Sequence, residues 1–396
     1  MTRRGKEWVH MDKRITKFMI NLLVLGLTGC TGSKNIQDLT YIVAIGLDYD
    51  ETKDEYTAYV QGLNFANVAK QEGSRSTDPI PTFVGSAKGK TLNMAVSNLY
   101  RVSRPPLFFG HTKTLVLSGN LLQYKFKEVL EDVGRNRSLR PSLELFVTDV
   151  GMEDIFSTKG LFDYPPVYTV LLTEEKSEGI QNDIDSTSLM HFLREYYEPM
   201  GTAMIPKINI DRHSWHADEE IPSLYLDSYS VFQGETLKGE ISADDSMTVD
   251  WLRNKKNTLD YALYDEGNIL STFKLSADKP KVKYDKSVSD FPEFSLEVSV
   301  EAELLEKVND IQYEKLHAKL QHSLEEKITK VYKHGFEKKM DLFDVGGRWY
   351  RSHPDKFHEL ENSGDKFYLS DSSLKKVKVK VEIKHFNAYR YIKETR

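Results

Sequence analysis

Cysteine is almost absent from this sequence, which has one, Cys30, among 396 residues. One cysteine excludes any disulfide within the chain, so the fold must be stabilised by core packing. Such a core is feasible because this length suits two or three domains and buries roughly three quarters of the surface of the unfolded chain. Long hydrophobic runs are also lacking: after residue 30 no apolar run approaches the roughly 18 residues of a membrane-spanning helix. We therefore predict no transmembrane helix after Cys30.

An excess of positive charge is missing as well. The full chain has a formal net charge of −6, and residues 30–396 carry 48 Lys and Arg against 58 Asp and Glu, a charge of −10. Proteins that bind nucleic acid neutralise phosphates with clustered bases, so this balance argues against a nucleic acid partner.

The sequence also lacks the common catalytic and metal-binding signatures. It has no Gly-x-Ser-x-Gly motif, and the stretch 110–113 (GHTK) has neither the further glycines of a dinucleotide-binding loop nor the GK[ST] of a P-loop. His213 and His216 do not have the i, i+4 spacing of a zinc protease helix, and we interpret them as part of a polar loop. We predict no catalytic residue and no metal site.

What the sequence does contain is a segment typical of an exported lipoprotein. A basic start is followed by the apolar run 18–27, too short to span a bilayer, and then by Leu27, Thr28, Gly29 and Cys30. These four residues resemble a bacterial lipobox. The resemblance implies that residues 1–29 are a signal peptide and that Cys30 carries a diacylglyceryl lipid, the one cofactor-like group expected. The alternative is an ordinary cysteine after a cleaved signal, and Met11 is an alternative start.

Two acyl chains suffice for stable anchoring to a membrane. Residues 30–37 are polar and are predicted to form the lipidated tether. Everything after them is then an extracytoplasmic domain held at a membrane surface. A cysteine-poor exported chain also suits a Gram-positive envelope better than a compartment that forms disulfides.

Hydrophobic periodicity after the tether predicts an α+β fold with three domains, each built from mixed or antiparallel sheets and packed helices. The expected divisions are an N-terminal α+β domain over 38–198, a strand-rich middle domain over 199–285 and a C-terminal α+β domain over 286–396. Period-two or continuous apolar runs predict strands, and apolar residues three and four apart predict helices. Strands are expected at 39–47, 56–65, 83–88, 114–117, 143–147, 203–210, 224–233, near 237, 267–275, 282–284, 294–305 and 376–384, and helices at 91–103, 121–134, 151–156, 188–197, 244–253 and 310–333.

Two stretches are candidate contact surfaces for a partner. The first comprises Phe108, Phe109, Gly110, His111 and Lys113, where we expect Gly110 at a turn position with positive φ. The second is the loop around Tyr164. The lysines that alternate along 376–384 are interpreted as the solvated face of a strand, with contact to anionic headgroups as the alternative.

Several motifs, in order along nearly the whole chain, resemble the Ger(x)C family, the C subunits of bacterial spore germinant receptors. Three features depart from that family: residues 31–34 (TGSK) replace a Trp-Asp-Arg-Arg-like run, Asp344 stands where the family usually has glycine, and Asn387 stands where the chain often ends on glycine. The matching stretches are the lipobox, 38–39 with 43–48 (VAIGLD), 108–117 (FFGHTKTLVL), the arginine-containing turn 135–140, 341–346 (DLFDVG) and the closing alternating strand.

The resemblance implies a non-catalytic subunit, anchored by lipid to the outer face of the spore inner membrane. It also implies a membrane-spanning A subunit and a transporter-like B subunit as partners, with germinant binding mainly in B. Two other functions would require different features. A solute-binding lipoprotein of a transporter predicts two similar α/β lobes, and an envelope hydrolase predicts a cluster of acid and base residues in a pocket.

Overall fold

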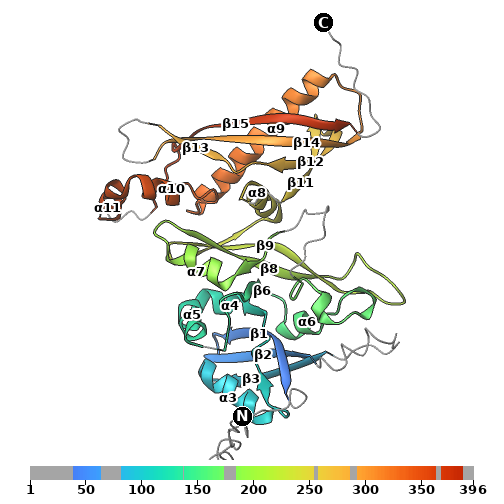
Figure 1. Ribbon diagram of the computed structural model, residues 1–396, viewed down its shortest axis with the longest axis vertical. Coiled ribbons are helices and arrows are strands. Elements are labelled where there is room, and N and C mark those ends of the chain that lie inside the picture. The colour runs from blue at the N-terminus through green and yellow to red at the C-terminus, as the bar shows by residue number, and fades with distance from the viewer. Residues whose placement is uncertain are drawn as a thin grey trace, which may run out of the picture.

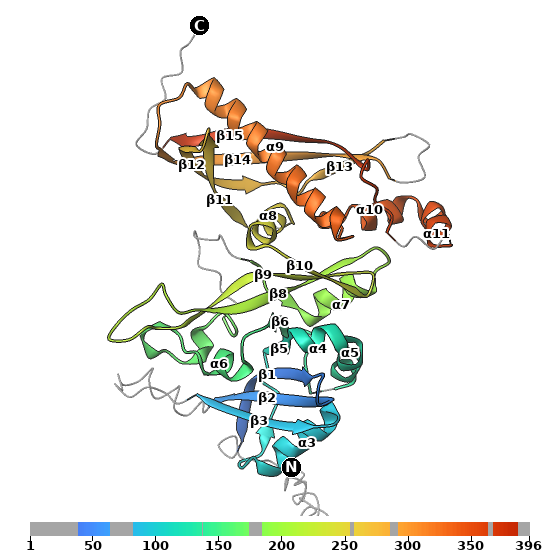
Figure 2. The same cartoon turned by 180° about the vertical axis from the view of Figure 1, so that it is seen from behind.

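The computed structural model describes residues 39–63, 82–136, 138–173, 184–253, 257–285, 292–362 and 367–386. Its helices and strands form an elongated α+β fold in which two sheets follow one another along the long axis (Figure 1). The view from behind shows the same division, with the long helix of the C-terminal part lying across the second sheet (Figure 2). The predicted fold class is therefore confirmed.

The first sheet has ten strands and mixed pairing. Its strands are β1 (Thr40–Asp50), β2 (Glu55–Leu63), β3 (Phe83–Gly89), β4 (Leu107–Phe108), β5 (Thr114–Ser118), β6 (Glu144–Thr148), β7 (Thr187–Ser188), β8 (Thr202–Asp211), β9 (Ser223–Gln233) and β10 (Thr236–Ile241). Their order is β10-β9-β8-β6-β5-β1-β2-β3, with β4 on β1 and β7 on β6. The central pairs β1–β5, β5–β6 and β6–β8 are parallel, and the outer pairs are antiparallel.

Helices cover both faces of this sheet. They are α3 (Leu92–Val102), α4 (Gly119–Tyr124), α5 (Phe126–Arg135), α6 (Met152–Ser157) and α7 (Leu189–Tyr197). Along β5, Leu115 and Leu117 pack in the core under α4, α5 and α7, whereas Val116 packs in the core with α6 on the opposite side. A strand buried on both faces must be apolar at every position, which explains the continuous apolar run in the sequence.

The second sheet has five strands and carries its helices on one side. Its elements are α8 (Ala243–Arg253), β11 (Thr258–Asp265), β12 (Asn268–Ala277), β13 (Lys281–Tyr284), β14 (Phe294–Lys307), α9 (Tyr313–Glu337), α10 (Val345–Ser352), α11 (Pro354–Asn362) and β15 (Leu374–Phe386). The order is β11-β12-β14-β13, and β15 pairs with β14 in parallel. Along α9 the residues at helical spacing, Leu316, Leu320, Leu324 and Ile328, are fully buried against the sheet.

Local predictions agree closely with this structure. Thr91 caps α3 as expected, accepting a hydrogen bond from the Met94 amide at 3.2 Å. In β15, Val377, Val379 and Ile383 are buried while the lysines between them are exposed, as the alternation predicted. Two corrections apply. The helix expected over 121–134 is two helices, α4 and α5, broken at Lys125, where φ is −134°. Strand β11 was not predicted.

The segment 199–285, expected as a middle domain, contributes strands to both sheets. Strands β8, β9 and β10 extend the first sheet, and β11, β12 and β13 belong to the second. The boundaries expected at 199 and 286 therefore do not coincide with the boundary between the sheets, which falls at α8. The division into three domains stays a prediction.

Candidate functional site

The predicted contact stretch 108–113 begins on β4, which pairs in parallel with the start of β1. Its side chains divide into two groups. Phe108, His111 and Lys113 are exposed, and the rings of Phe108 and His111 lie 5.6 and 5.3 Å from the Tyr41 ring. Phe109 is half-buried and packs on the cluster of Ile42, Val60 and Leu99. The exposed group can contact a partner, whereas Phe109 serves the fold.

Gly110 does not have the positive φ that was expected. Its structural requirement is space: a Cβ atom there would lie 2.5 Å from Cζ of the Phe108 ring. The turn is instead stabilised by hydrogen bonds from the Thr112 amide to the Phe109 carbonyl, at 3.0 Å, and from the Thr112 hydroxyl to the Ile42 carbonyl, at 3.2 Å. A side chain at position 110 would therefore require the Phe108 ring to move, because this ring packs closely against the Gly110 backbone.

The loop around Tyr164 presents three aromatic side chains to solvent. Tyr164 and Tyr168 are more than half exposed, with ring centroids 5.2 Å apart. Phe162, which was not predicted, is 84% exposed and has a φ of +60°. A left-handed conformation is rare for a bulky residue. The sequence shows that aromatic residues gather here, but not that the backbone directs one of them outward.

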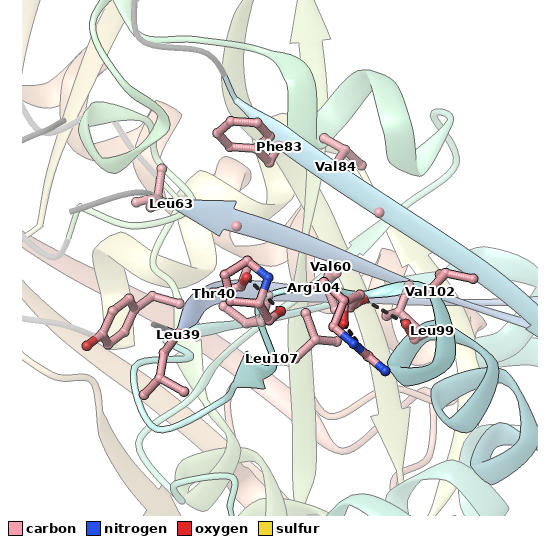
Figure 3. Close-up of a pocket in the computed structure, with 16 residues that line it drawn as sticks. Leu39, Thr40, Val60, Leu63, Phe83, Val84, Leu99, Val102, Arg104 and Leu107 are labelled. Atoms are coloured by element: carbon pink, nitrogen blue, oxygen red, sulfur yellow. Dashed lines mark hydrogen bonds between the residues drawn. The ribbon is translucent and has the colours of Figure 1, made fainter. Parts of the chain in front are cut away.

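An apolar pocket of about 440 Å³ opens beside the contact stretch, at the end of the first sheet where β1 starts and β2 ends. Its walls are the ends of β1, β2 and β3, the C-terminal end of α3 and the loop 103–107. Figure 3 shows Leu99, Val102, Arg104 and Leu107 close together on one side of the pocket. The loop is held to β1 by the Thr40 amide and hydroxyl, which donate to the carbonyls of Pro106 and Pro105 at 2.9 and 3.1 Å.

A buried polar network joins the two sheets. The Gln233 amide donates to the Met200 and Gly201 carbonyls at 3.1 and 3.2 Å, and its oxygen accepts from the Asp341 backbone amide at 2.9 Å. The Thr202 hydroxyl lies 2.8 Å from that oxygen and 2.9 Å from the Asp341 carbonyl, and it can donate to either. These contacts connect β8 and β9 to the segment that follows α9.

The carboxylate of Asp341 is 1% exposed and accepts hydrogen bonds from the Gly346 amide, at 2.6 Å, and from the Tyr368 hydroxyl. Burial raises the pKa of Tyr368 well above 10, so its hydroxyl remains a donor. Gly346 is packed so closely that a Cβ atom would lie 1.9 Å from Cζ of Tyr368. The 341–346 motif is therefore the point where the second sheet is fixed to the first.

A cleft of about 400 Å³ lies next to this network and is rich in arginine. Arg348 donates to the Pro280 carbonyl at 2.9 Å, and Arg351 lies 3.3 Å from Glu198 and 3.8 Å from Asp344. Asp344, at φ +51°, has its pKa raised to about 6, first by burial and then by the charge of Asp341. The left-handed φ explains why glycine suits this position in the family that the sequence resembles.

Replacing Asp344 by asparagine is expected to stabilise the protein at neutral pH. The folded state holds a proton on this carboxyl group up to about pH 6, whereas the unfolded chain loses it near 3.8, so ionisation costs stability as the pH rises between these values. Asparagine has no charge and tolerates a left-handed φ. The variant should match wild type near pH 4 and exceed it by about 2 kcal/mol above pH 6, measured by urea unfolding across this range.

Asp211 provides the matched control. Hydrogen bonds from Ser214 and His213 lower the pKa of this carboxyl group, so its ionised form stabilises the folded state above the ordinary pKa. Asp211→Asn should therefore lose stability at neutral pH relative to acid pH, the opposite sign. Equal pH profiles for the two asparagine variants would contradict the effect assigned to Asp344.

Several sequence predictions fall on residues that the structure does not describe. Cys30 and the lipobox residues Leu27, Thr28 and Gly29 lie outside the described residues, so lipidation stays a prediction. Among the described residues, none of the helices is both long enough and apolar enough to cross a bilayer. Within the same ranges no group of His, Cys, Asp or Glu could hold a metal ion.

Comparisons with known proteins match both parts of the chain. The family described as "Spore germination protein N-terminal domain" matches residues 32–210, and the family described as "Spore germination B3/ GerAC like, C-terminal" matches residues 227–387. Spore germination protein KC of Bacillus subtilis (strain 168) is 25% identical over 91% of this chain and 92% of its own length. The GerQC spore germination protein of Bacillus cereus is 21% identical over 83% of this chain and 88% of its own.

A crystal structure of the GerBC protein matches 88% of this chain and 98% of its own, with 20% identity and a TM-score of 0.48. The two family matches carry the assignment because they follow one another along the sequence in the expected order. Together they include the contact stretch 108–113, the buried polar network that joins the two sheets, and the closing strand β15. The chain belongs to the Ger(x)C family of spore germination proteins.

Proposed function

We propose that this chain is the lipid-anchored C subunit of a spore germinant receptor. In this role it is a non-catalytic scaffold or signalling subunit at the outer face of the spore inner membrane. The observation that carries the proposal is the match of two adjoining spore germination families to residues 32–210 and 227–387. The lipobox at 27–30, directly after a short apolar run, supports the anchor.

The membrane-spanning A and B subunits of the receptor are the proposed partners. The shape of the molecule supports a linking role, because the start of β1 at Thr40, three residues after the tether, lies towards one end and the second sheet lies at the other (Figure 1). The exposed side chains of Phe108, His111 and Lys113 are close to the tethered end, since Phe108 pairs with Tyr41. They are therefore the first candidates for contact with a subunit embedded in the same membrane.

The solute-binding alternative is not favoured by the fold. A solute-binding lipoprotein would have two similar α/β lobes around a hinge. Here the first sheet has ten strands with a parallel centre, and the second has five strands of which all but β15 pair antiparallel.

The anchor is tested by Cys30→Ala in spores, with Ser33→Ala in the tether as the matched control. Loss of the thiol removes the site of lipid attachment, so the Cys30→Ala chain should leave the membrane fraction while the Ser33→Ala chain remains there. Mass spectrometry of the N-terminal peptide should find the lipid on wild type and on Ser33→Ala. Retention of unlipidated Cys30→Ala protein in membranes would contradict anchoring by this lipid.

A further inference from the structure

The scaffold role proposed above does not explain why the pocket at the start of β1 is apolar. Its walls are formed by aliphatic and aromatic side chains, and Val60 and Leu99 are almost fully buried behind its surface. Of the residues that line it, Arg104 alone is charged. A volume of about 440 Å³ is within the roughly 300–1,000 Å³ range of small-molecule sites. An apolar cavity with one cation at its rim fits an amphiphile that has an anionic head.

The rim of the pocket exposes large apolar side chains. Val102 is 77% exposed and Phe83 is 53% exposed, and both line the opening (Figure 3). Apolar side chains gathered around a hollow are unusual on a solvated surface and are typical of a contact with lipid or protein.

The charge of this region differs from that of the rest of the chain. Residues 79–127 contain no Asp or Glu and seven Lys and Arg, although the whole chain has 60 acidic residues in 396. This run includes β3, α3 and the loop 103–107, which form three of the walls of the pocket. Of the seven bases, Arg104 lines the pocket and Arg101 lies beside it in the last turn of α3. Anionic phospholipids attract these positive charges and repel the acidic remainder of the chain.

The pocket is also close to the proposed anchor. Leu39 lines it and lies nine residues after Cys30, a separation that an extended chain spans in at most about 32 Å. This step rests on the proposed function, because it assumes that Cys30 is lipidated. The opening is then held within reach of the outer surface of the membrane.

We propose that this pocket binds one acyl chain of an anionic membrane phospholipid, with the headgroup at Arg104. The apolar walls remove the acyl chain from water, and Val102 and Phe83 enter the interfacial region of the bilayer. Arg104 supplies the positive charge, while its guanidinium also donates to the Ser103 carbonyl at 2.7 Å, which keeps it beside the opening. Binding of the phospholipid in the pocket is a second contact with the membrane, in addition to the lipid on Cys30. It orients the subunit on the membrane, which a flexible tether cannot do.

Gly85 offers a variant that fills the pocket with little strain. A Cβ atom at this position would lie 3.4 Å from a Val60 methyl carbon and 3.6 Å from a Leu99 methyl carbon, both ordinary contacts. Valine suits a strand, and its methyl groups would occupy space in the pocket. Gly85→Val should therefore narrow the pocket at Val60 and Leu99, where the end of an acyl chain would lie, while the protein stays folded, which urea unfolding checks.

The test uses the full lipoprotein, purified from membranes and returned to vesicles that contain a phosphatidylglycerol with a photoreactive group near the end of one acyl chain. After illumination, mass spectrometry locates the labelled peptides. We expect labelling of the peptides that contain 83–85 and 99–107, and its loss in Gly85→Val. Label that is absent from these peptides would overturn the proposal and is the result expected if a protein surface occupies the pocket instead. Label that is unchanged in Gly85→Val would also overturn it, because the probe would then reach these peptides without entering the pocket.

The charge is tested with Arg104→Gln and, as control, Arg140→Gln on an exposed turn of the same domain. Labelling of the pocket should fall about fivefold in Arg104→Gln and should not change in Arg140→Gln. Equal labelling from phosphatidylcholine and phosphatidylglycerol probes would contradict the role of the headgroup. The N-terminal peptide in the same spectra shows whether Cys30 carries lipid, so a failed anchor and an empty pocket are distinguished.

Discussion

Gly346→Ala is expected to lower the free energy of unfolding by about 2–4 kcal/mol. The added methyl group would lie 1.9 Å from the Tyr368 ring, which is 2% exposed and has no free space to enter. Displacing Tyr368 breaks its hydrogen bond to Asp341 and leaves a buried carboxylate with one fewer donor. Urea unfolding followed by circular dichroism measures the change.

Gly134→Ala is the control for the effect that replacing glycine by alanine has on helix propensity alone. Gly134 lies in the last turn of α5, and a Cβ atom there meets nothing within 4 Å. Alanine favours helix over glycine by roughly 0.5–1 kcal/mol, so this variant should be unchanged or slightly stabilised. A loss below about 1 kcal/mol for Gly346→Ala would show that the segment 341–346 adjusts easily, contrary to its assigned structural role.

Gln233→Leu is expected to cost about 2–5 kcal/mol, because leucine fills the space without making any of the hydrogen bonds. The Asp341 amide and the Met200 carbonyl would lose their partners inside the protein, and each such buried group costs roughly 1–3 kcal/mol. Since these bonds join β9 to the second sheet, the loss should also allow the two sheets to unfold at different urea concentrations. Of the four tryptophans, Trp251 and Trp349 are buried in the core of the second sheet, whereas Trp215 is half exposed in the loop after β8. Tryptophan fluorescence is therefore weighted towards the second sheet and should then no longer coincide with circular dichroism.

Gln61→Leu is the matched control, since Gln61 is also a fully buried glutamine in a strand of the first sheet. Its amide nitrogen makes one hydrogen bond, to the Phe156 carbonyl at 2.6 Å, while its amide oxygen has no partner. Leucine leaves the Phe156 carbonyl without this donor, which costs roughly 1–3 kcal/mol, but it also removes an amide oxygen that has no partner, so the net cost should be about 1 kcal/mol. If the two variants lose equal free energy of unfolding, the hydrogen bonds of Gln233 between the two sheets contribute no more to stability than those of a glutamine within one sheet.

Elements whose pattern is local were predictable from the sequence. The period of 3.6 along α9 and the strict alternation along β15 each place one apolar face on a core, and the structure has both. Strand β11 was missed because only Leu259 and Leu263 among its eight residues are buried apolar side chains. Glu266 and Gly267, which both have positive φ between β11 and β12, form the type of two-residue turn that could have signalled this hairpin.

Features that depend on distant residues could not be predicted. Gln233 and Asp341 are 108 positions apart, and no local pattern indicates that they meet. The same holds for Gly346, whose need for glycine comes from Tyr368, and for Gly110, whose need comes from Phe108 rather than from its φ. The segment 199–285 reads as a series of strands, but the sheet that each strand joins is decided by its partners.

The most direct test of the central claim is germination of spores that lack this chain, compared with the same spores that express it again. The account predicts that the response to the nutrient of its receptor is lost and then restored, while non-nutrient triggers work equally well in both. The Cys30→Ala chain should restore the nutrient response less well than Ser33→Ala. If spores without this chain germinate normally with every known class of nutrient germinant, its assignment as a receptor subunit is contradicted.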